Sequence, residues 1–140
     1  MKSTKPSAAS SGPPELTFFV DRSLGRQLVA NALRLAGESV EIHDDHFAPD
    51  APDDVWLTAV GQRGWIALTK DKAIRFRKNE RAAVQSANAR LFVLTAGNIT
   101  GAECAAAIVA ALPAIRKLVF KASPPFIATV SRAGNVSLLA

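Results

Sequence analysis

The sequence predicts a three-layer α/β/α domain with a mostly parallel central sheet and a C-terminal hairpin. Short apolar runs that are typical of strands alternate along the chain with longer segments that are typical of helices. Such alternation favours parallel strands with helices on both faces of the sheet. The 140 residues are 49% hydrophobic and 21% charged, which suits one globular domain with a sizeable core.

Residues 1–14 are expected to form a disordered leader ahead of a domain over residues 15–140. This leader is polar and rich in Pro and Ser, so ordering it would cost more entropy than its contacts could offset. It lacks the apolar core of a signal peptide, and no stretch is apolar for long enough to span a membrane. The single cysteine, Cys104, excludes an internal disulfide framework and fits a reducing compartment. We therefore expect a cytoplasmic protein.

The first half of the chain is expected to contain three strands and two helices. Apolar runs predict strands over residues 16–20, 39–42 and 65–69. Residues 22–36 are expected to form one helix that ends at Gly37. A second helix, over residues 55–63, follows a proline-rich loop and is expected to be capped by Asp53 or Asp54.

The second half is expected to contribute two more helices, one further parallel strand and the hairpin. Asn79 is expected to cap a helix that runs to about residue 88. A final helix is expected over residues 102–118, with a bend at Pro113. Strands are expected over residues 90–95, 126–130 and 136–139, the last two joined by a short turn.

Three aspartates lie where this topology would bring them to one edge of the sheet. Asp21 and Asp71 follow predicted strands, and Asp54 lies at the start of the helix that leads into the third strand. Ligands of open parallel sheets bind beyond the carboxyl ends of the strands. Clustered carboxylates repel one another unless a cation lies between them, and Mg²⁺ or Mn²⁺ prefers such oxygen ligands. Taken singly, each acid could equally be a turn, cap or loop residue.

These residues resemble the PIN-like domains, the family of VapC-type toxin ribonucleases. The resemblance consists of Phe-Phe-Val before Asp21, Asp-Val-Trp-Leu beginning at Asp54, and a strand that ends in Thr-Lys-Asp at Asp71. It covers about residues 16–95, and the Thr-x-Asp ending is its most specific part. The shortened region before Asp54 is more similar to compact PIN-like variants than to the standard VapC enzyme.

The resemblance implies a metal-dependent endoribonuclease that hydrolyses RNA phosphodiesters with Mg²⁺ or Mn²⁺. Its catalytic acids would be Asp21, Asp54 and Asp71. Family members gather four acids, and for the second one this chain offers Asp44, Asp45 or Glu41 as alternatives. The metal-ligand candidates are Asp21, Asp45, Asp53, Asp54 and Asp71.

Basic residues crowd the segment that follows Asp71, and the whole chain carries a net charge of +5. They are Lys70, Lys72, Arg75, Arg77, Lys78 and Arg81. The candidates for substrate binding are Thr69, Lys70, Lys72 and Arg75. The basic side chains would neutralise RNA phosphates, although such a run can also be a solvated face. Thr69 would hydrogen-bond a metal-bound water or orient Asp71, or would be an ordinary β-branched strand residue.

The resemblance implies RNA as substrate, a cognate antitoxin protein as partner and, as an option, a homodimer, with no membrane role. The main alternative is a catalytically incomplete PIN-like module that binds RNA or a partner protein. A phosphoacceptor signalling domain is a weaker alternative, because the predicted strand over residues 126–130 lacks the lysine that it would need. His43 and His46 lack a third nitrogen or sulfur ligand, so a zinc site is not expected.

Overall fold

The computed structural model describes residues 16–139, so the expected leader over residues 1–14 lies outside the described part. Six strands form one sheet in the order β2-β1-β3-β4-β5-β6. The strands are β1 (Thr17–Val20), β2 (Ser39–Ile42), β3 (Ile66–Thr69), β4 (Arg90–Leu94), β5 (Phe126–Val130) and β6 (Val136–Leu138). The helices are α1 (Leu28–Leu35), α2 (Asp53–Gln62), α3 (Lys78–Ala87) and α4 (Gly101–Lys121).

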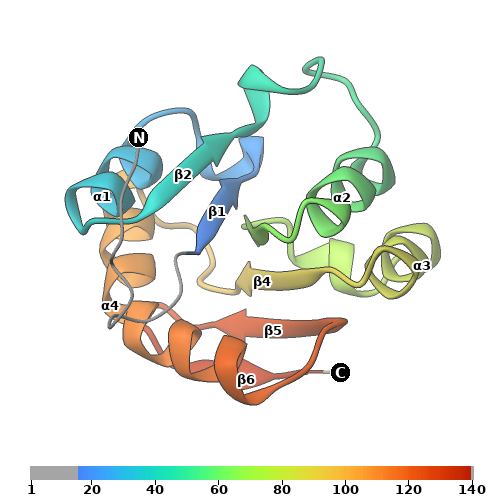
Figure 1. The fold of residues 1–140 in the computed structure, drawn as a ribbon. Helices are drawn as coiled ribbons and strands as arrows, with labels where there is room; N and C mark the ends of the chain where they lie inside the picture. The colour runs from blue at the N-terminus through green and yellow to red at the C-terminus, as the bar shows by residue number, and fades with distance from the viewer. Residues whose placement is uncertain (1–15, 140) are drawn as a thin grey trace, which may run out of the picture.

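Strands β1 to β5 are parallel, and β6 pairs antiparallel with β5. Figure 1 shows α1 and α4 on one side of the sheet and α2 and α3 on the other. The predicted α/β class, the mostly parallel sheet and the C-terminal hairpin are therefore confirmed. Within the described residues, no helix is long and apolar enough to cross a membrane.

The strand side chains divide the core into two halves. Because successive side chains of a strand point to opposite faces, Phe18 and Val20 pack with α1 and α4, while Phe19 between them packs with α2. Phe18 and Phe19 are completely buried, as expected for a strand covered by helices on both faces. The end of β1 is thus held firmly from both sides, which fixes the residue that follows it.

The expected single helix over residues 22–36 is wrong. The chain instead forms a 3-10 turn over Arg22–Leu24, and α1 begins at Leu28. Gly25 lies between them with φ of 81°, a left-handed conformation that ends the turn and that glycine adopts without strain. This break directs Arg22 and Ser23 back toward the end of the sheet.

Two predicted helix caps are also wrong. Helix α2 begins at Asp53, so Asp53 and Asp54 both lie in its first turn and Pro52 takes the cap position. Helix α3 begins one residue before Asn79, with Arg77 at its cap position. Pro52, with φ of −59°, already has a backbone angle compatible with entry into a helix.

Helix α4 is longer than the predicted range and continues past Pro113. It begins with a capping box, in which the Thr100 hydroxyl accepts from the Glu103 backbone N–H and the Glu103 carboxylate accepts from the Thr100 N–H. These two bonds satisfy donors that a helix start otherwise leaves free.

The sheet order places a switch point between β1 and β3. From β1 the chain crosses to β2 on one side, and then returns to form β3 on the other side of β1. The two connections leave in opposite directions, which opens a crevice at the carboxyl ends of these strands. Asp21 and Thr69 lie at this point.

Candidate functional site

Asp21 is a buried carboxylate at the end of β1. It is 6% exposed, and its backbone N–H donates to the Leu68 carbonyl at 3.0 Å. Its Oδ2 accepts hydrogen bonds from the hydroxyls of Thr69 at 2.7 Å and Ser23 at 2.8 Å. A buried carboxylate needs such donors, because removal from water otherwise destabilises its charged form.

Thr69 connects Asp21 to Asp71. The same Thr69 Oγ1 that donates to Asp21 accepts from the Asp71 backbone N–H at 3.1 Å. Ser23 adds a second connection, since its Oγ accepts from the Lys70 backbone N–H at 2.8 Å. The carboxyl ends of β1 and β3 are therefore joined by side-chain hydroxyls, and the predicted acids at residues 21 and 71 lie close together.

Asp53 and Asp71 both contact one cation, Arg77. The Nη1 atom of Arg77 lies 3.2 Å from Oδ2 of Asp53 and 3.0 Å from Oδ2 of Asp71, with Oε2 of Glu80 at 3.8 Å. The hydrogen bond and charge of Asp71, followed by the charges of Glu80 and Asp53, raise the pKa of Arg77. The Trp56 indole N–H donates to Asp53 Oδ1 at 2.9 Å and so orients that carboxylate from the core.

The other predicted acids are placed differently. The described contacts of Asp54 include no ion pair or hydrogen bond of its carboxylate; its backbone carbonyl accepts from Thr58. Asp45 is exposed. Glu41 contacts His46 at 2.6 Å. Asp44 forms ion pairs with two arginines.

The donor chemistry around Arg77 fits a divalent ion. Two carboxylate oxygens converge on a single cationic nitrogen, and Asp21 adds a third carboxylate joined to Asp71 through Thr69. Oxygen ligands of this kind are those that Mg²⁺ and Mn²⁺ prefer. Within residues 16–139, however, no group of three His, Cys, Asp or Glu side chains is arranged to hold a metal. The carboxylates would have to move together, away from Arg77.

The four predicted substrate-binding residues differ in their exposure and in their contacts. Thr69 is completely buried, so it supports the acids from beneath. The Nζ of Lys70 lies 3.4 Å from the Ile99 carbonyl, and Lys72 is exposed. The Arg75 guanidinium lies over the Phe76 ring, 4.6 Å from its centroid. Lys72 and Arg75 thus form a basic surface on the segment that follows Asp71.

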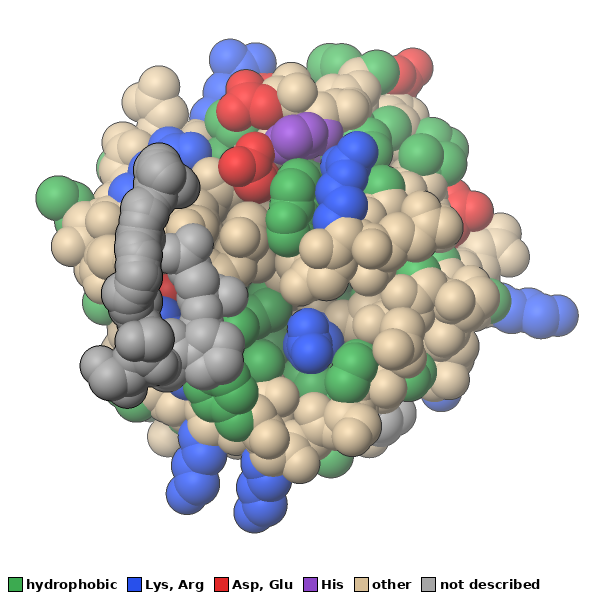
Figure 2. Space-filling model, viewed as in Figure 1, with side chains coloured by type: hydrophobic (Ala, Val, Ile, Leu, Met, Phe, Trp, Pro, Cys, Tyr) green, Lys and Arg blue, Asp and Glu red, His purple; other side chains and the backbone are tan. Residues whose placement is uncertain are grey.

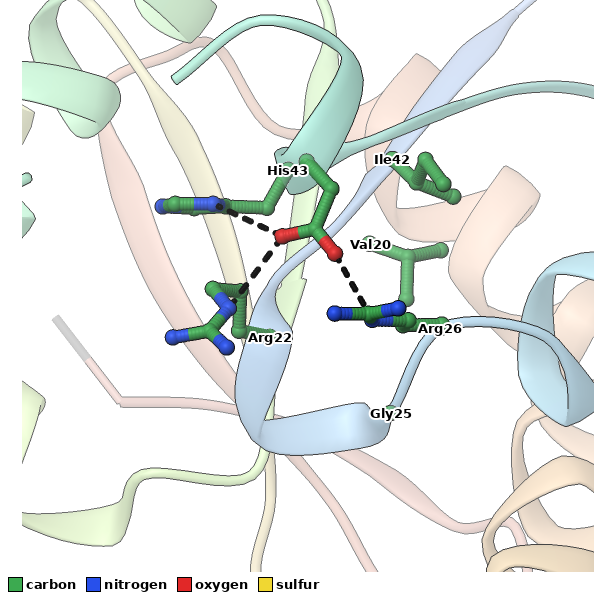
Figure 3. A pocket seen from close by; sticks show the side chains of 7 residues that line it. Val20, Arg22, Gly25, Arg26, Ile42 and His43 are labelled. Atoms are coloured by element: carbon green, nitrogen blue, oxygen red, sulfur yellow. Dashed lines mark ion pairs between the residues drawn. The ribbon is translucent and has the colours of Figure 1, made fainter. Parts of the chain in front are cut away.

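A pocket of about 230 Å³ lies beside Asp21, at the ends of β1 and β2. Figure 3 shows Arg22, Arg26 and His43 around one carboxylate, that of Asp44. In Figure 2, acidic, basic and histidine side chains lie side by side in the upper part of the face shown, around the end of β2. The pocket next to Asp21 thus contains two arginines and a histidine.

Sequence reasoning missed Ser23 and Arg77 as parts of the site. Ser23 lies two residues after a strand-end aspartate, a spacing at which a tight turn can return a hydroxyl to the carboxylate. In the sequence, Arg77 is one of several basic residues in a run. Its role depends on the separation of Asp53 and Asp71 in space, which the sequence does not contain.

Comparison of the chain with known proteins identifies a family and a relative. Residues 16–96 match the protein family described as "PIN like domain". The chain is similar to the "Putative ribonuclease VapC45" of Mycobacterium tuberculosis (strain ATCC 25618 / H37Rv), at 35% identity over 126 residues. That alignment covers 87% of this chain and 91% of the relative. No solved structure matches the chain.

Proposed function

The chain belongs to the PIN-like domain family, and from this premise we propose that it is a metal-dependent endoribonuclease. The observation that carries the proposal is the link from buried Asp21 through Thr69 to Asp71 at the switch point of the sheet. A buried carboxylate held by two hydroxyls is not needed to stabilise an apolar core. It is expected in a site that must present negative charge at a fixed position.

Asp21, Asp71 and an acid at the start of α2 would hold the metal. The contacts of Asp53 with Arg77 favour Asp53 for this third position, with Asp54 as its neighbour in the same helical turn. When bound, Mg²⁺ or Mn²⁺ would polarise the phosphodiester and lower the pKa of a water molecule. The protein residues fix the carboxylates: Thr69 and Ser23 hold Asp21, and Trp56 holds Asp53.

RNA would bind over the basic surface beside the acids. Lys70, Lys72 and Arg75 lie in the segment that follows Thr69 and would neutralise phosphates, which makes the affinity depend on salt concentration. The net charge of +5 supports a polyanionic substrate. A lysine or arginine close to the cleaved bond would also stabilise developing negative charge.

We further propose that the protein is the toxin of a toxin–antitoxin pair. The support is the similarity to a relative named a VapC ribonuclease. An antitoxin would inhibit it by covering the acidic edge of the sheet with a basic or extended segment, whose charge would oppose that of the carboxylates.

A catalytically incomplete, RNA-binding module is the second candidate. It is favoured by one observation, that the described residues hold no group of three metal-ligating side chains arranged around a common point. Under this alternative, Arg77 would be the permanent partner of Asp53 and Asp71, and RNA would bind without being cut.

An RNA cleavage assay separates the two candidates. The full chain is expected to cut single-stranded RNA with Mg²⁺ or Mn²⁺ and to lose this activity in a chelator. Asp21→Asn and Asp71→Asn are each expected to reduce the rate about 100-fold or more, because each removes a metal-ligating charge. Asp50→Asn, in an exposed loop, is the control and should retain activity. Cleavage that survives chelation would reject the mechanism, while salt-sensitive binding without cleavage would support the incomplete module.

A further inference from the structure

The pocket beside Asp21 contains two arginines that converge on one carboxylate. The Nε atom of Arg22 lies 3.2 Å from Oδ1 of Asp44, and that of Arg26 lies 2.9 Å from Oδ2. Figure 3 shows both guanidinium groups directed toward Asp44 from the turn that follows β1. The pocket thus places a single anionic group between two cations.

Most of the hydrogen-bonding capacity of these arginines remains free. A guanidinium has five N–H donors. The described contacts use two of them on Arg22, toward Asp44 and the Pro49 carbonyl, and one on Arg26. The three charged side chains together carry one excess positive charge. Such a fork of donors matches the oxygens of a phosphate as well as those of a carboxylate.

His43 provides an independent indication that the pocket receives a polar ligand. Its side chain is 3% exposed, yet its Nδ1 atom has no hydrogen-bond partner among the described residues. This atom lies 3.8 Å from Oδ1 of Asp44, an oxygen that the Nε atom of Arg22 already approaches to 3.2 Å. Buried polar atoms are nearly always paired, so the unpaired His43 Nδ1 at the edge of this pocket calls for a partner that the described residues do not supply.

We propose that Arg22, Arg26 and His43 form a subsite for a phosphate of the RNA backbone, and that Asp44 occupies it in the free protein. This inference rests on the proposed function, because it takes RNA as the substrate. The phosphate would compete with the Asp44 carboxylate for the arginines and would accept from His43 Nδ1. The Arg22 and Arg26 side chains of these ion pairs are 42% and 74% exposed, and pairs open to solvent contribute little, so a phosphate can displace the Asp44 carboxylate from them.

The proposed subsite also defines the path that an RNA strand would follow across the crevice. Arg22 directly follows Asp21, so a phosphate bound there would lie on the β2 side of the acids, opposite the basic surface that follows Asp71. A single strand of RNA held at both places would cross the switch point. Its intervening phosphodiester would then lie over the carboxylates.

RNA affinity measured in a chelator tests the subsite apart from cleavage. The probe is a fluorescein-labelled single-stranded RNA with a 5′-hydroxyl end, and its binding to the full chain is followed by anisotropy across a salt series. Arg26→Ala is expected to weaken binding about tenfold and to lower the salt slope by about 0.7. Lys121→Ala removes the same charge from the far end of α4 and should change both quantities little. Arg26 is 74% exposed, so its replacement should leave the fold intact.

A second pair of variants tests the competition by Asp44. Asp44→Asn is expected to strengthen RNA binding about fivefold, because it removes the resident anion. Asp45→Asn changes the charge equally at the next, exposed residue and should strengthen binding less than about twofold. Equal gains in the two variants would indicate general electrostatics and would overturn the assignment.

Other outcomes also decide the question. If Arg26→Ala binds like the Lys121→Ala control while the wild type still cuts RNA with metal, the subsite is wrong and the proposed function stands. If the effect of Arg26→Ala appears only with RNA that carries a 5′-phosphate, the pocket binds a terminal phosphate and not the backbone. A wild type that neither binds nor cuts RNA would reject the subsite and the function together.

Discussion

A single hydroxyl, that of Thr69, connects the two strand-end acids. It donates to Asp21 and accepts from the Asp71 backbone, so its hydroxyl acts as donor and as acceptor at the two candidate site residues. Only a residue with a short hydroxyl side chain can do this from the last position of a buried strand. Thr69 thus connects Asp21 to Asp71 directly, while Ser23 connects Asp21 to the neighbouring Lys70 backbone.

Replacing Thr69 with Val is expected to destabilise the protein. Valine fills nearly the same volume but leaves the buried Asp21 carboxylate without one of its two hydroxyl donors. The free energy of unfolding should fall by about 1–3 kcal/mol, measured by urea denaturation. Thr69→Ser retains the hydroxyl and should lose less. A larger loss for Ser than for Val would mean that Thr69 matters for packing and not for its hydrogen bonds.

Arg77 is expected to compete with the metal for Asp53 and Asp71. Arg77→Ala should increase the affinity for Mn²⁺ about 3- to 10-fold, because the metal no longer has to displace a resident cation. Without metal the same variant should lower the melting temperature, since two carboxylates lose their shared counterion, and added Mn²⁺ should restore it. Thermal denaturation with and without Mn²⁺ measures both effects.

Arg81→Ala is the matched control for this prediction. Arg81 lies one turn further along α3 and forms no ion pair among the described residues. It should leave the response to Mn²⁺ unchanged. An identical response of the two variants would show that net charge, and not the contact with the acids, governs metal binding.

At the scale of elements, the first turn of α2 and the turn after β1 position the side chains of the candidate site. Helix α2 begins at Asp53, and that first turn presents an acid toward Arg77 and Asp71. The turn over Arg22–Leu24, ended by Gly25, returns Ser23 to Asp21. Both features place side chains within a few residues of a strand end, where the backbone is fixed by the core.

The capping box of α4 is expected to make the stability of the protein depend on pH. The hydrogen bond from the Thr100 backbone N–H, the Thr100 hydroxyl and the charge of Arg132 lower the pKa of Glu103 below its ordinary value of 4.5. A carboxyl whose pKa is lowered in the folded state stabilises the protein above that ordinary value, and the stabilisation is lost as the pH falls through the folded pKa. Glu103→Gln should therefore show a smaller drop in melting temperature between pH 6 and pH 3 than the wild type, as checked by circular dichroism.

Thr100→Ala provides a companion test, because it removes the other half of the box. It should lower the melting temperature at neutral pH, as the loss of an N-terminal cap does in other helices. Combined with Glu103→Gln it should add little further change in the pH dependence, since both act on the same pair of hydrogen bonds. Full additivity would show that Glu103 titrates independently of the box.

The sequence predicted the sheet and most elements because their signals are local. Apolar runs such as that before Asp21 read clearly as buried strands, and the Thr-x-Asp ending indicated the site. It failed at the helix over residues 22–36, where a left-handed Gly25 interrupts a pattern that otherwise looks periodic. The sequence favoured Asp54 over Asp53, but Arg77 contacts Asp53, because neighbours in a helix point in different directions and the sequence does not show which one faces Arg77.

At the scale of the whole molecule, aspartates lie at the carboxyl ends of the strands of a basic protein. The chain carries 17 Lys and Arg against 12 Asp and Glu, yet Asp21 is joined through Thr69 to the backbone of Asp71, and Asp71 shares Arg77 with Asp53. The surrounding charge would attract RNA, and the carboxylates would need a cation before the phosphates could approach them. The metal is thus the part of the proposed function on which the others depend.

Calorimetric titration of the full chain with MnCl₂ tests this dependence most directly. We predict saturable binding by the wild type, loss of that binding in Asp71→Asn, and unchanged binding in Asp50→Asn, whose side chain lies in an exposed loop. Binding that survives Asp71→Asn, or that falls equally in the Asp50→Asn control, would contradict a metal site at the ends of β1 and β3.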